Sequence, residues 1–350
     1  MLTRIVIAAL ALLGLGAGAS ADPVADFYKG KQVQLIVGYG TGGGYDVYAR
    51  ALARHIGRHI PGNPSVVVQN MPGAGSLRAA NFLYHAAPKD GTAFGLFARN
   101  MPLLAILGSN PNVQFDPRKF TWLGSSSSFA DDAYLLFVRK DAAVKSVDDA
   151  RRPGGPPLIV AGTAEGATGN DVPVLLRDAL GLNIKLIAGY PDSGAIFLAV
   201  DRKEAEGRTV DYSSVKTSKP DWLKPDGSMR VLVQFGRTTR HPDFPDVPTA
   251  RELARDDKSR ALIEVAELPL NLARPYVAPP GVPKDRAKAL QDAFMATHRD
   301  PQFLEDAGRI KMDVSPVTSE EALQLIDKIS GAPPEILKTI DKLLADNKGG

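Results

Sequence analysis

The chain of 350 residues contains no cysteine. Without cysteine there is no disulfide bond, no thiol nucleophile, no thiolate metal ligand and no lipid-modified N-terminal cysteine. Histidines are also few: of the five, only His55 and His59 have the four-residue spacing of a two-histidine metal site on a helix. The helix predicted there carries three arginines and no carboxylate, so we expect a solvated face and no metal.

The chain also lacks a strong charge of either sign. It has 42 Lys and Arg against 39 Asp and Glu, a formal net charge of +3, and the two signs alternate without long runs. This pattern gives no electrostatic footprint for nucleic acid, so no nucleic-acid partner is expected. Catalytic motifs are missing too: there is no Gly-x-Ser-x-Gly elbow, no metalloprotease helix motif and no Walker loop. The sequence therefore predicts a protein that is not an enzyme and has no cofactor; an exported enzyme is the lesser alternative.

Long hydrophobic runs are absent except near the start of the chain. There, Arg4 precedes an apolar run from residue 5 to about 18, and Ala19-Ser20-Ala21 follows it. A positive start, a short apolar core and a small-x-small exit are typical of a secretory signal peptide, and the run is shorter than the ~20 residues of a membrane span. We expect residues 1–21 to be removed by cleavage after Ala21 and the mature protein to reside in the periplasm.

Short apolar runs recur along the rest of the chain, with helical patterns between several of them. This alternation is typical of an α/β protein with largely parallel sheets. The clearest helix continues from Val47, with Asp46 at its N-cap. The eight runs predicted as strands are 33–37, 65–69, 93–97, 134–138, 158–161, 184–188, 229–234 and 275–278.

The most informative segment joins the first strand to the first helix and is rich in glycine from residue 38 to 44. Glycine lets the backbone approach a ligand closely, and the start of a helix offers free N–H groups to an anion. We predict that this segment holds a ligand through Tyr39, Thr41, Gly43, Gly44 and Asp46.

The same segment also satisfies the Gly-x-Gly-x-x-Gly spacing of a dinucleotide-binding loop. That fingerprint needs a carboxylate near the end of the second strand to hold the ribose, and none occurs from Gly57 to Lys89. A nicotinamide cofactor is therefore not expected.

Further small-residue loops follow other predicted strands. In a parallel sheet such loops share one edge, where open α/β sheets bind ligands. Two of these loops carry a carboxylate, Glu165 and Asp192. The sequence leaves two roles open for each: to recognise a ligand ammonium or hydroxyl group, or to be no more than a helix N-cap or a solvated carboxylate. The additional candidates for the site are Ala74, Gly75, Ser76, Thr163, Ala164, Tyr190 and Asp192.

Five blocks of the chain, in order, resemble the periplasmic solute receptors of tripartite tricarboxylate transporters, often called Bug-type receptors. The resemblance covers nearly all of the mature chain. The blocks are 35–37 with Gly43-Gly44, Asp46 and Ala49-Arg50; 66–68 with Asn70 and Pro72-Gly73-Ala74-Gly75; Pro88 to Ala93; Ala278 to Pro283; and Asp300-Pro301-Gln302-Phe303.

The resemblance implies an α/β, two-lobed fold of the periplasmic-binding-protein type (type II), with two mixed sheets flanked by helices and hinged by two crossover segments. We predict that residues 22–125 and 235–350 form the first lobe and residues 126–234 the second. The implied function is to bind a small organic carboxylate between the lobes and deliver it to integral-membrane permease subunits, as a monomer, by switching from open to closed. The alternative is a sensory or scaffold protein of the same fold.

Overall fold

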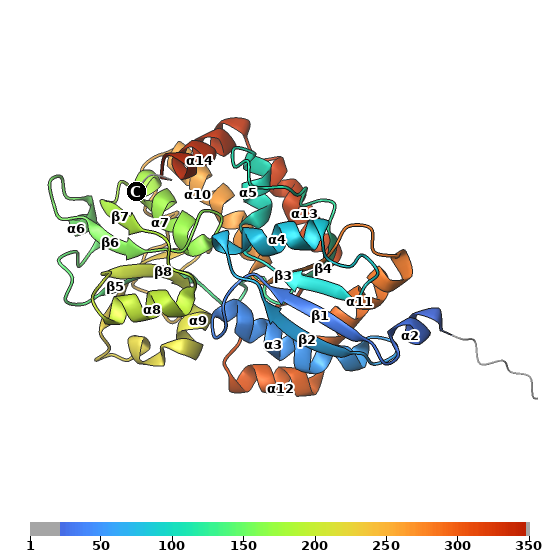
Figure 1. Cartoon of the computed structure of the whole chain (residues 1–350). Helices are drawn as coiled ribbons and strands as arrows, with labels where there is room; N and C mark the ends of the chain where they lie inside the picture. The colour runs from blue at the N-terminus through green and yellow to red at the C-terminus, as the bar shows by residue number, and fades with distance from the viewer. Residues whose placement is uncertain (1–21, 348–350) are drawn as a thin grey trace, which may run out of the picture.

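The computed structural model describes residues 22–347. Two lobes lie side by side, each built on one β-sheet with helices on its faces (Figure 1). The two-lobed α/β fold with two mixed sheets, expected from the sequence, is confirmed. Among the described residues, no helix is long and apolar enough to span a membrane.

The first sheet has six strands in the order β11-β4-β10-β3-β1-β2. The strands β1, β2 and β3 are parallel, so their carboxyl ends share one edge, whereas β10 runs antiparallel between β3 and β4. The bounds are β1 (Gln32–Val37), β2 (Ser65–Asn70), β3 (Ala93–Leu96), β4 (Thr121–Ser125), β10 (Pro275–Ala278) and β11 (Val317–Thr318).

The second sheet has five strands in the order β7-β6-β8-β5-β9. The strands β6, β7 and β8 are parallel, and β5 runs antiparallel to both β8 and β9. The bounds are β5 (Tyr134–Arg139), β6 (Leu158–Ala161), β7 (Ile184–Ile187), β8 (Gly207–Asp211) and β9 (Met229–Phe235).

Helices cover both sheets and follow most of the strands (Figure 1). The α-helices are α2 (Pro23–Tyr28), α3 (Gly44–Ile56), α4 (Leu77–His85), α5 (Met101–Leu107), α6 (Val147–Arg151), α7 (Thr168–Leu180), α8 (Ser193–Asp201), α9 (Tyr212–Ser218), α10 (Asp257–Glu267), α11 (Lys284–Thr297), α12 (Pro301–Arg309), α13 (Ser319–Ser330) and α14 (Pro334–Asp346). The short 3-10 helices are η1 (Gly57–His59), η2 (Ala74–Ser76), η3 (Pro220–Leu223) and η4 (Leu268–Leu272).

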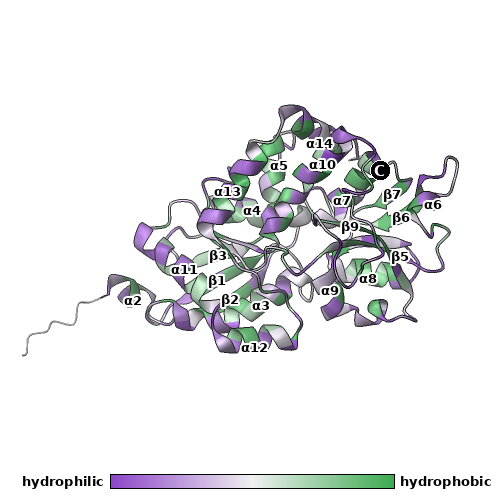
Figure 2. Ribbon diagram, turned by 180° about the vertical axis from the view of Figure 1, so that it is seen from behind, coloured by the Kyte–Doolittle hydropathy of each residue, from purple (hydrophilic) through white to green (hydrophobic). Residues whose placement is uncertain are grey.

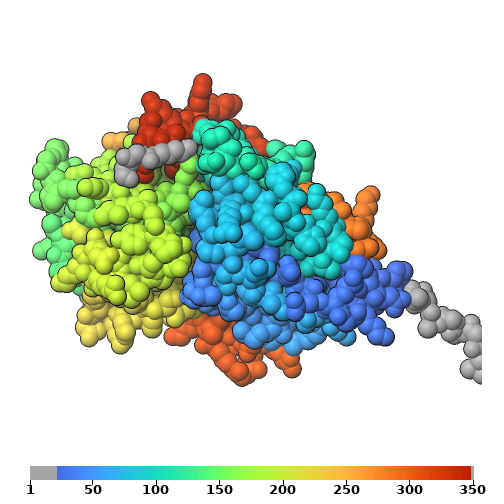
Figure 3. All heavy atoms as spheres, in the orientation of Figure 1, coloured from blue at the N-terminus to red at the C-terminus, as the bar shows by residue number. Residues whose placement is uncertain are grey.

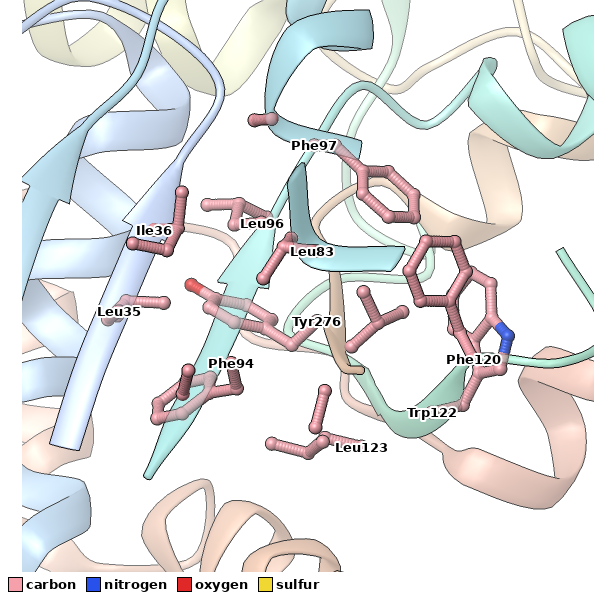
Figure 4. Close-up of a cluster of buried hydrophobic side chains, with 14 of the residues drawn as sticks. Leu35, Ile36, Leu83, Phe94, Leu96, Phe97, Phe120, Trp122, Leu123 and Tyr276 are labelled. Atoms are coloured by element: carbon pink, nitrogen blue, oxygen red, sulfur yellow. The ribbon is translucent and has the colours of Figure 1, made fainter. Parts of the chain in front are cut away.

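Each lobe has its own hydrophobic core. Hydrophobic residues concentrate in the strands, and the helices carry hydrophilic residues on their outward sides (Figure 2). In the first lobe, aromatic rings from distant segments pack together, for example Phe97 edge-on to Trp122 at 6.2 Å and Phe94 near Tyr276 (Figure 4). Burying one such side chain stabilises a fold by roughly 1.5–3 kcal/mol, so these contacts stabilise the first lobe.

All eight predicted strands are present, each within one residue of its predicted ends. The strands β4, β8 and β11 were not predicted. The first helix begins at Gly44 with Gly43 as its N-cap, so the prediction of Asp46 as N-cap is wrong. Asp46 lies in the first turn instead, and its carboxylate accepts a hydrogen bond from the N–H of Gly42, which precedes the helix.

The last third of the chain contacts both lobes. Helices α10 and α14 pack against α7 of the second lobe, and their apolar residues join its core. Helix α13 instead contacts β4 and α5 of the first lobe. The sequence prediction assigned all of residues 235–350 to the first lobe. That division stays a prediction, and the packing of α10 and α14 against the second lobe differs from it.

Candidate functional site

A cavity lies between the two lobes, beside the carboxyl ends of β1 and β3 and the loops that follow β6 and β7. Its volume is about 70 Å³. One ordered water molecule needs about 10–15 Å³, so the cavity has room for more than one water-sized group.

Three long helices begin at this cavity. The first residues of α3, α7 and α8, which are Gly44, Thr168 and Ser193, all line it. The start of a helix has unpaired N–H groups and the positive end of the helix dipole. Helices from both lobes therefore make the cavity favourable for negative charge.

Three buried arginines line the same cavity: Arg99, Arg208 and Arg274, with exposed fractions of 1%, 4% and 1%. Asp211, at the end of β8, accepts hydrogen bonds from Arg274 at 2.8 Å and from Arg99 at 3.3 Å. Burial alone would raise the pKa of Asp211, but the two guanidinium groups outweigh burial and hold that pKa well below its ordinary value. The aspartate is therefore ionised and offsets one of the three positive charges.

Arg208 has no carboxylate partner among residues 22–347. It donates to the carbonyl oxygen of Ser193 at 2.9 Å and to the hydroxyl of Ser193 at 2.8 Å, and its guanidinium lies 4.1 Å from the centre of the Phe197 ring. Burial lowers the pKa of Arg208 to about 10, so it is still a cation at neutral pH. Asp211 and Asp192 are near enough to favour the charged form, but neither is bonded to Arg208. A buried cation without a directly bonded anion is costly, and an anionic ligand reduces that cost.

Several hydrogen-bonding atoms on the cavity wall are buried and find no partner within the described chain. They include Nη1 of Arg99, Nε of Arg208 and Oγ1 of Thr163. Buried polar atoms in proteins are nearly always hydrogen-bonded, so an unpaired group on a cavity wall indicates a missing partner. Guanidinium N–H groups bind carboxylate oxygens with short, charge-assisted hydrogen bonds.

Aromatic rings form one side of the cavity. Tyr39 and Tyr45 stack with ring centres 4.7 Å apart. The hydroxyl of Tyr45 accepts hydrogen bonds from the backbone N–H of Arg99 at 3.1 Å and from its Nε at 3.2 Å. The tyrosine thus holds the Arg99 side chain in place and provides an apolar surface beside it.

The lobes touch around the cavity, and their surfaces meet along a seam (Figure 3). A Cβ added to Gly44 would lie 2.5 Å from Oγ of Ser214 in the second lobe. A Cβ on Gly75 would lie 3.0 Å from the carbonyl oxygen of Glu165. Across the same seam, Asn100 donates to Asp171 at 2.9 Å. The structure therefore has the lobes closed on each other.

The structure brings together at the cavity five of the residues predicted from the sequence: Tyr39, Gly43, Gly44, Thr163 and Asp192. Asp192 is also the N-cap of α8, since its carboxylate accepts from the N–H of Ala195 at 2.9 Å. The helix-cap role is therefore present, and recognition of a ligand by this carboxylate stays a prediction.

The other predicted residues do not line this cavity. Asp46 is buried but bonded to Gly42 and Arg50, and the hydroxyl of Ser76 accepts from the N–H of Ala98. Thr41 and Ala74 are exposed, and Gly75, Ala164 and Tyr190 are partly exposed.

The sequence interpretation missed the arginines and Asp211. A signal existed for Arg99, which comes two residues after the predicted strand 93–97 and therefore at the ligand edge of the sheet. Arg208 and Asp211 lie on β8, which was not predicted, and Arg274 directly precedes β10.

The two spaced histidines have carboxylate partners from another helix. His55 lies 2.8 Å from Asp306 and His59 lies 2.8 Å from Asp300, both on or next to α12. The expectation of a solvated face is wrong for His55, which is buried. Among residues 22–347, no group of three or more His, Cys, Asp or Glu could hold a metal ion.

Comparison with known proteins gives a consistent result. Residues 48–341 match the family model described as "Tripartite tricarboxylate transporter family receptor". Protein BugT of Bordetella pertussis is 34% identical over 256 residues, which cover 70% of this chain and 73% of that protein.

Solved structures share the fold. The periplasmic binding protein BugD superposes with a TM-score of 0.68 at 20% identity, over 90% of this chain and 98% of that chain. The R. palustris protein Rpa4515, solved with adipate, superposes with a TM-score of 0.68 at 19% identity, over 89% and 97%.

Proposed function

The chain belongs to the receptor family of the tripartite tricarboxylate transporters, and from that membership we propose that it binds a small organic carboxylate in the cavity between its lobes. Members of this family are periplasmic solute-binding receptors and not enzymes. The bound carboxylate would then be delivered to the membrane subunits of a transporter of this type.

The observation that carries the proposal is the state of Arg208. It is 4% exposed, lines the cavity, and has an Nε atom without a partner and no bonded carboxylate in the described part of the chain. A ligand carboxylate supplies the missing acceptor and a negative charge in direct contact with the guanidinium. The adipate in the R. palustris relative is a ligand of this chemical class and supports the assignment.

Closure of the lobes is the proposed signal to the transporter. The cavity is lined from both lobes, so a ligand held there contacts both and stabilises the closed arrangement over an open one. Export to the periplasm rests on the predicted signal peptide, residues 1–21, which lie outside the described residues. The monomeric state stays a prediction.

A thermal-shift screen of the mature protein against mono-, di- and tricarboxylates tests the proposal. A ligand that binds the native state raises the unfolding midpoint by mass action. We expect one series of carboxylates to raise the midpoint of the wild type and to have no effect on Arg208→Gln. Arg230→Gln is the matched control, because Arg230 also lies on a strand and donates to backbone carbonyls, but outside the cavity.

A wild type that responds to no carboxylate would reject the receptor role in favour of a sensory or scaffold role. A shift that persists in Arg208→Gln would place the ligand elsewhere.

A further inference from the structure

We infer that Arg99 and Arg274 form a carboxylate-binding site of the first lobe, and that Asp211 of the second lobe occupies this site in the closed protein in place of a ligand carboxylate. The inference deepens the proposed function and rests on it. Three observations carry it: the first lobe itself positions both arginines, it provides no carboxylate for them, and Asp211 meets them as a free carboxylate would.

Contacts within the first lobe position both arginines. The backbone N–H and Nε of Arg99 donate to the hydroxyl of Tyr45 at 3.1 and 3.2 Å. The backbone N–H of Arg274 donates to Oγ of Ser125 at 3.0 Å. Its guanidinium lies 4.9 Å from the ring centre of Tyr45 and 4.5 Å from that of Tyr48. Since these partners come from α3 and β4, the contacts do not depend on the second lobe.

The first lobe supplies no counter-charge to this pair. Within residues 22–347, the only ion pairs of Arg99 and Arg274 are those with Asp211. The carboxylate in the first turn of α3, Asp46, is bonded to Arg50 at 2.9 Å instead. Two buried guanidinium groups without an anion are costly, so the pair favours a carboxylate from outside its own lobe.

Asp211 shows that a carboxylate fits between the two guanidinium groups. Its Oδ1 accepts from Nη2 of Arg99 at 3.3 Å, and its Oδ2 accepts from Nη2 of Arg274 at 2.8 Å. Each oxygen thus has one guanidinium, and such charge-assisted hydrogen bonds are the ones by which arginine recognises carboxylates. Nη1 of Arg99 and Nε of Arg274 have no partner in the described part of the chain, so Asp211 does not use all the donors of the pair.

Asp211 is fixed to the second lobe. It is the N-cap of α9, and its Oδ2 also accepts from the hydroxyl of Ser213 and the N–H of Ser214, both at 3.1 Å. Separation of the lobes therefore withdraws this carboxylate from Arg99 and Arg274 and leaves the pair open to an anion from solution. On closing, Asp211 and a ligand carboxylate compete for the same two guanidinium groups.

Rescue by a small free carboxylate tests this inference. Asp211→Ser removes the carboxylate but keeps a good N-cap residue for α9. The mature wild type and the variant are unfolded by heat at neutral pH in sodium acetate and in sodium chloride of equal ionic strength. We expect acetate, relative to chloride, to raise the midpoint of Asp211→Ser by about 2 °C or more beyond its effect on the wild type, because acetate takes the vacant place.

Two further proteins locate the effect. Adding Arg274→Gln to Asp211→Ser removes one of the two guanidinium groups, so the additional acetate effect should disappear. Asp256→Ser is the matched control: Asp256 caps α10 in the same way but is exposed and outside the cavity, so acetate should act on this variant as on the wild type.

Asp211→Asn decides the matter if the serine variant folds in neither salt. Asparagine keeps the size of the side chain and the N-cap but carries no charge. Acetate therefore competes with it more successfully than with aspartate, and the midpoint should again rise by more than that of the wild type.

The inference is overturned if acetate stabilises no Asp211 variant more than the wild type, or if the additional effect persists after Arg274→Gln. A wild type that responds to the carboxylate panel, with Asp211 variants that acetate does not rescue, would leave the proposed function standing without the inference. A wild type that responds to no carboxylate would reject the proposed function, and with it any ligand for which Asp211 could substitute.

Discussion

The carboxylate of Asp211, at the end of a strand in the second lobe, accepts a hydrogen bond at 2.8 Å from Arg274, at the start of a strand in the first. Both side chains are buried, and Arg99 adds a second guanidinium to the same carboxylate. This ionic bridge joins the lobes beside the cavity, so part of the contact between the lobes is made by the chain itself.

Asp211→Asn should destabilise the protein by about 3 kcal/mol or more, because it leaves two buried guanidinium groups without their carboxylate. Urea unfolding would measure the change. Asp327→Asn removes an exposed ion pair to Arg118 and should leave the free energy of unfolding nearly unchanged. If both variants lost the same free energy of unfolding, the buried bridge would contribute no more to stability than an exposed ion pair.

The pH dependence of stability should include a contribution from Asp171. Burial raises the pKa of this carboxyl from 3.8 to about 7. The folded state therefore holds a proton that the unfolded state releases between pH 4 and 7. This contribution is fully present below pH 4 and is lost as the pH rises through 7, at up to about 1.4 kcal/mol per pH unit.

Unfolding of the wild type and Asp171→Asn in urea at a series of pH values would isolate this contribution. The stability of the wild type relative to the variant should fall between pH 4 and 7. Asp132 also has a raised pKa but is present in both proteins, so its effect cancels in the difference. A difference that is constant with pH would contradict the prediction.

Gly44→Ala should weaken ligand binding without weakening the fold. The added Cβ would lie 2.5 Å from Oγ of Ser214 and 3.3 Å from Nη2 of Arg274, so it obstructs the closed form. Within its own lobe, alanine is a better helix residue than glycine. We expect at least about tenfold weaker binding of the best carboxylate and a more open particle by small-angle X-ray scattering.

Gly308→Ala provides the control, because a Cβ there meets nothing within 4 Å and Gly308 also lies in a helix. Equally tight binding by Gly44→Ala and Gly308→Ala would show that the added Cβ does not obstruct closure.

The strands with clear apolar runs could be predicted from the sequence, because hydrophobic periodicity is local. Strand β8 could not, because Arg208, Thr209 and Asp211 leave it only one large apolar residue, Val210. All of β8 is nonetheless buried: Arg208 and Asp211 line the cavity, and the Thr209 hydroxyl donates to the carbonyl oxygen of Gly169 in the same lobe. Hydrophobicity therefore fails as a signal for strands that are buried against a site.

The glycine loops could also be predicted, because each directly follows a predicted strand in the sequence. The charged part of the site could not: Arg99 and Asp211 are 112 positions apart in the chain, and Asp211 and Arg274 are 63 apart. Only the tertiary fold brings them together. The sequence also could not distinguish Asp192, which reaches the cavity, from Asp46, which is bonded within its own loop.

The return of α14 to the second lobe has a consequence for the order of events during synthesis. Ile336, Ile340 and Leu344 complete a core whose other members, such as Leu175 and Leu176 of α7, are made more than 150 residues earlier. On the first sheet, β11 likewise adds its pairing to β4 late in the chain. The second lobe therefore cannot complete its core before α14 has been made, and the first sheet cannot complete its pairing before β11 has been made.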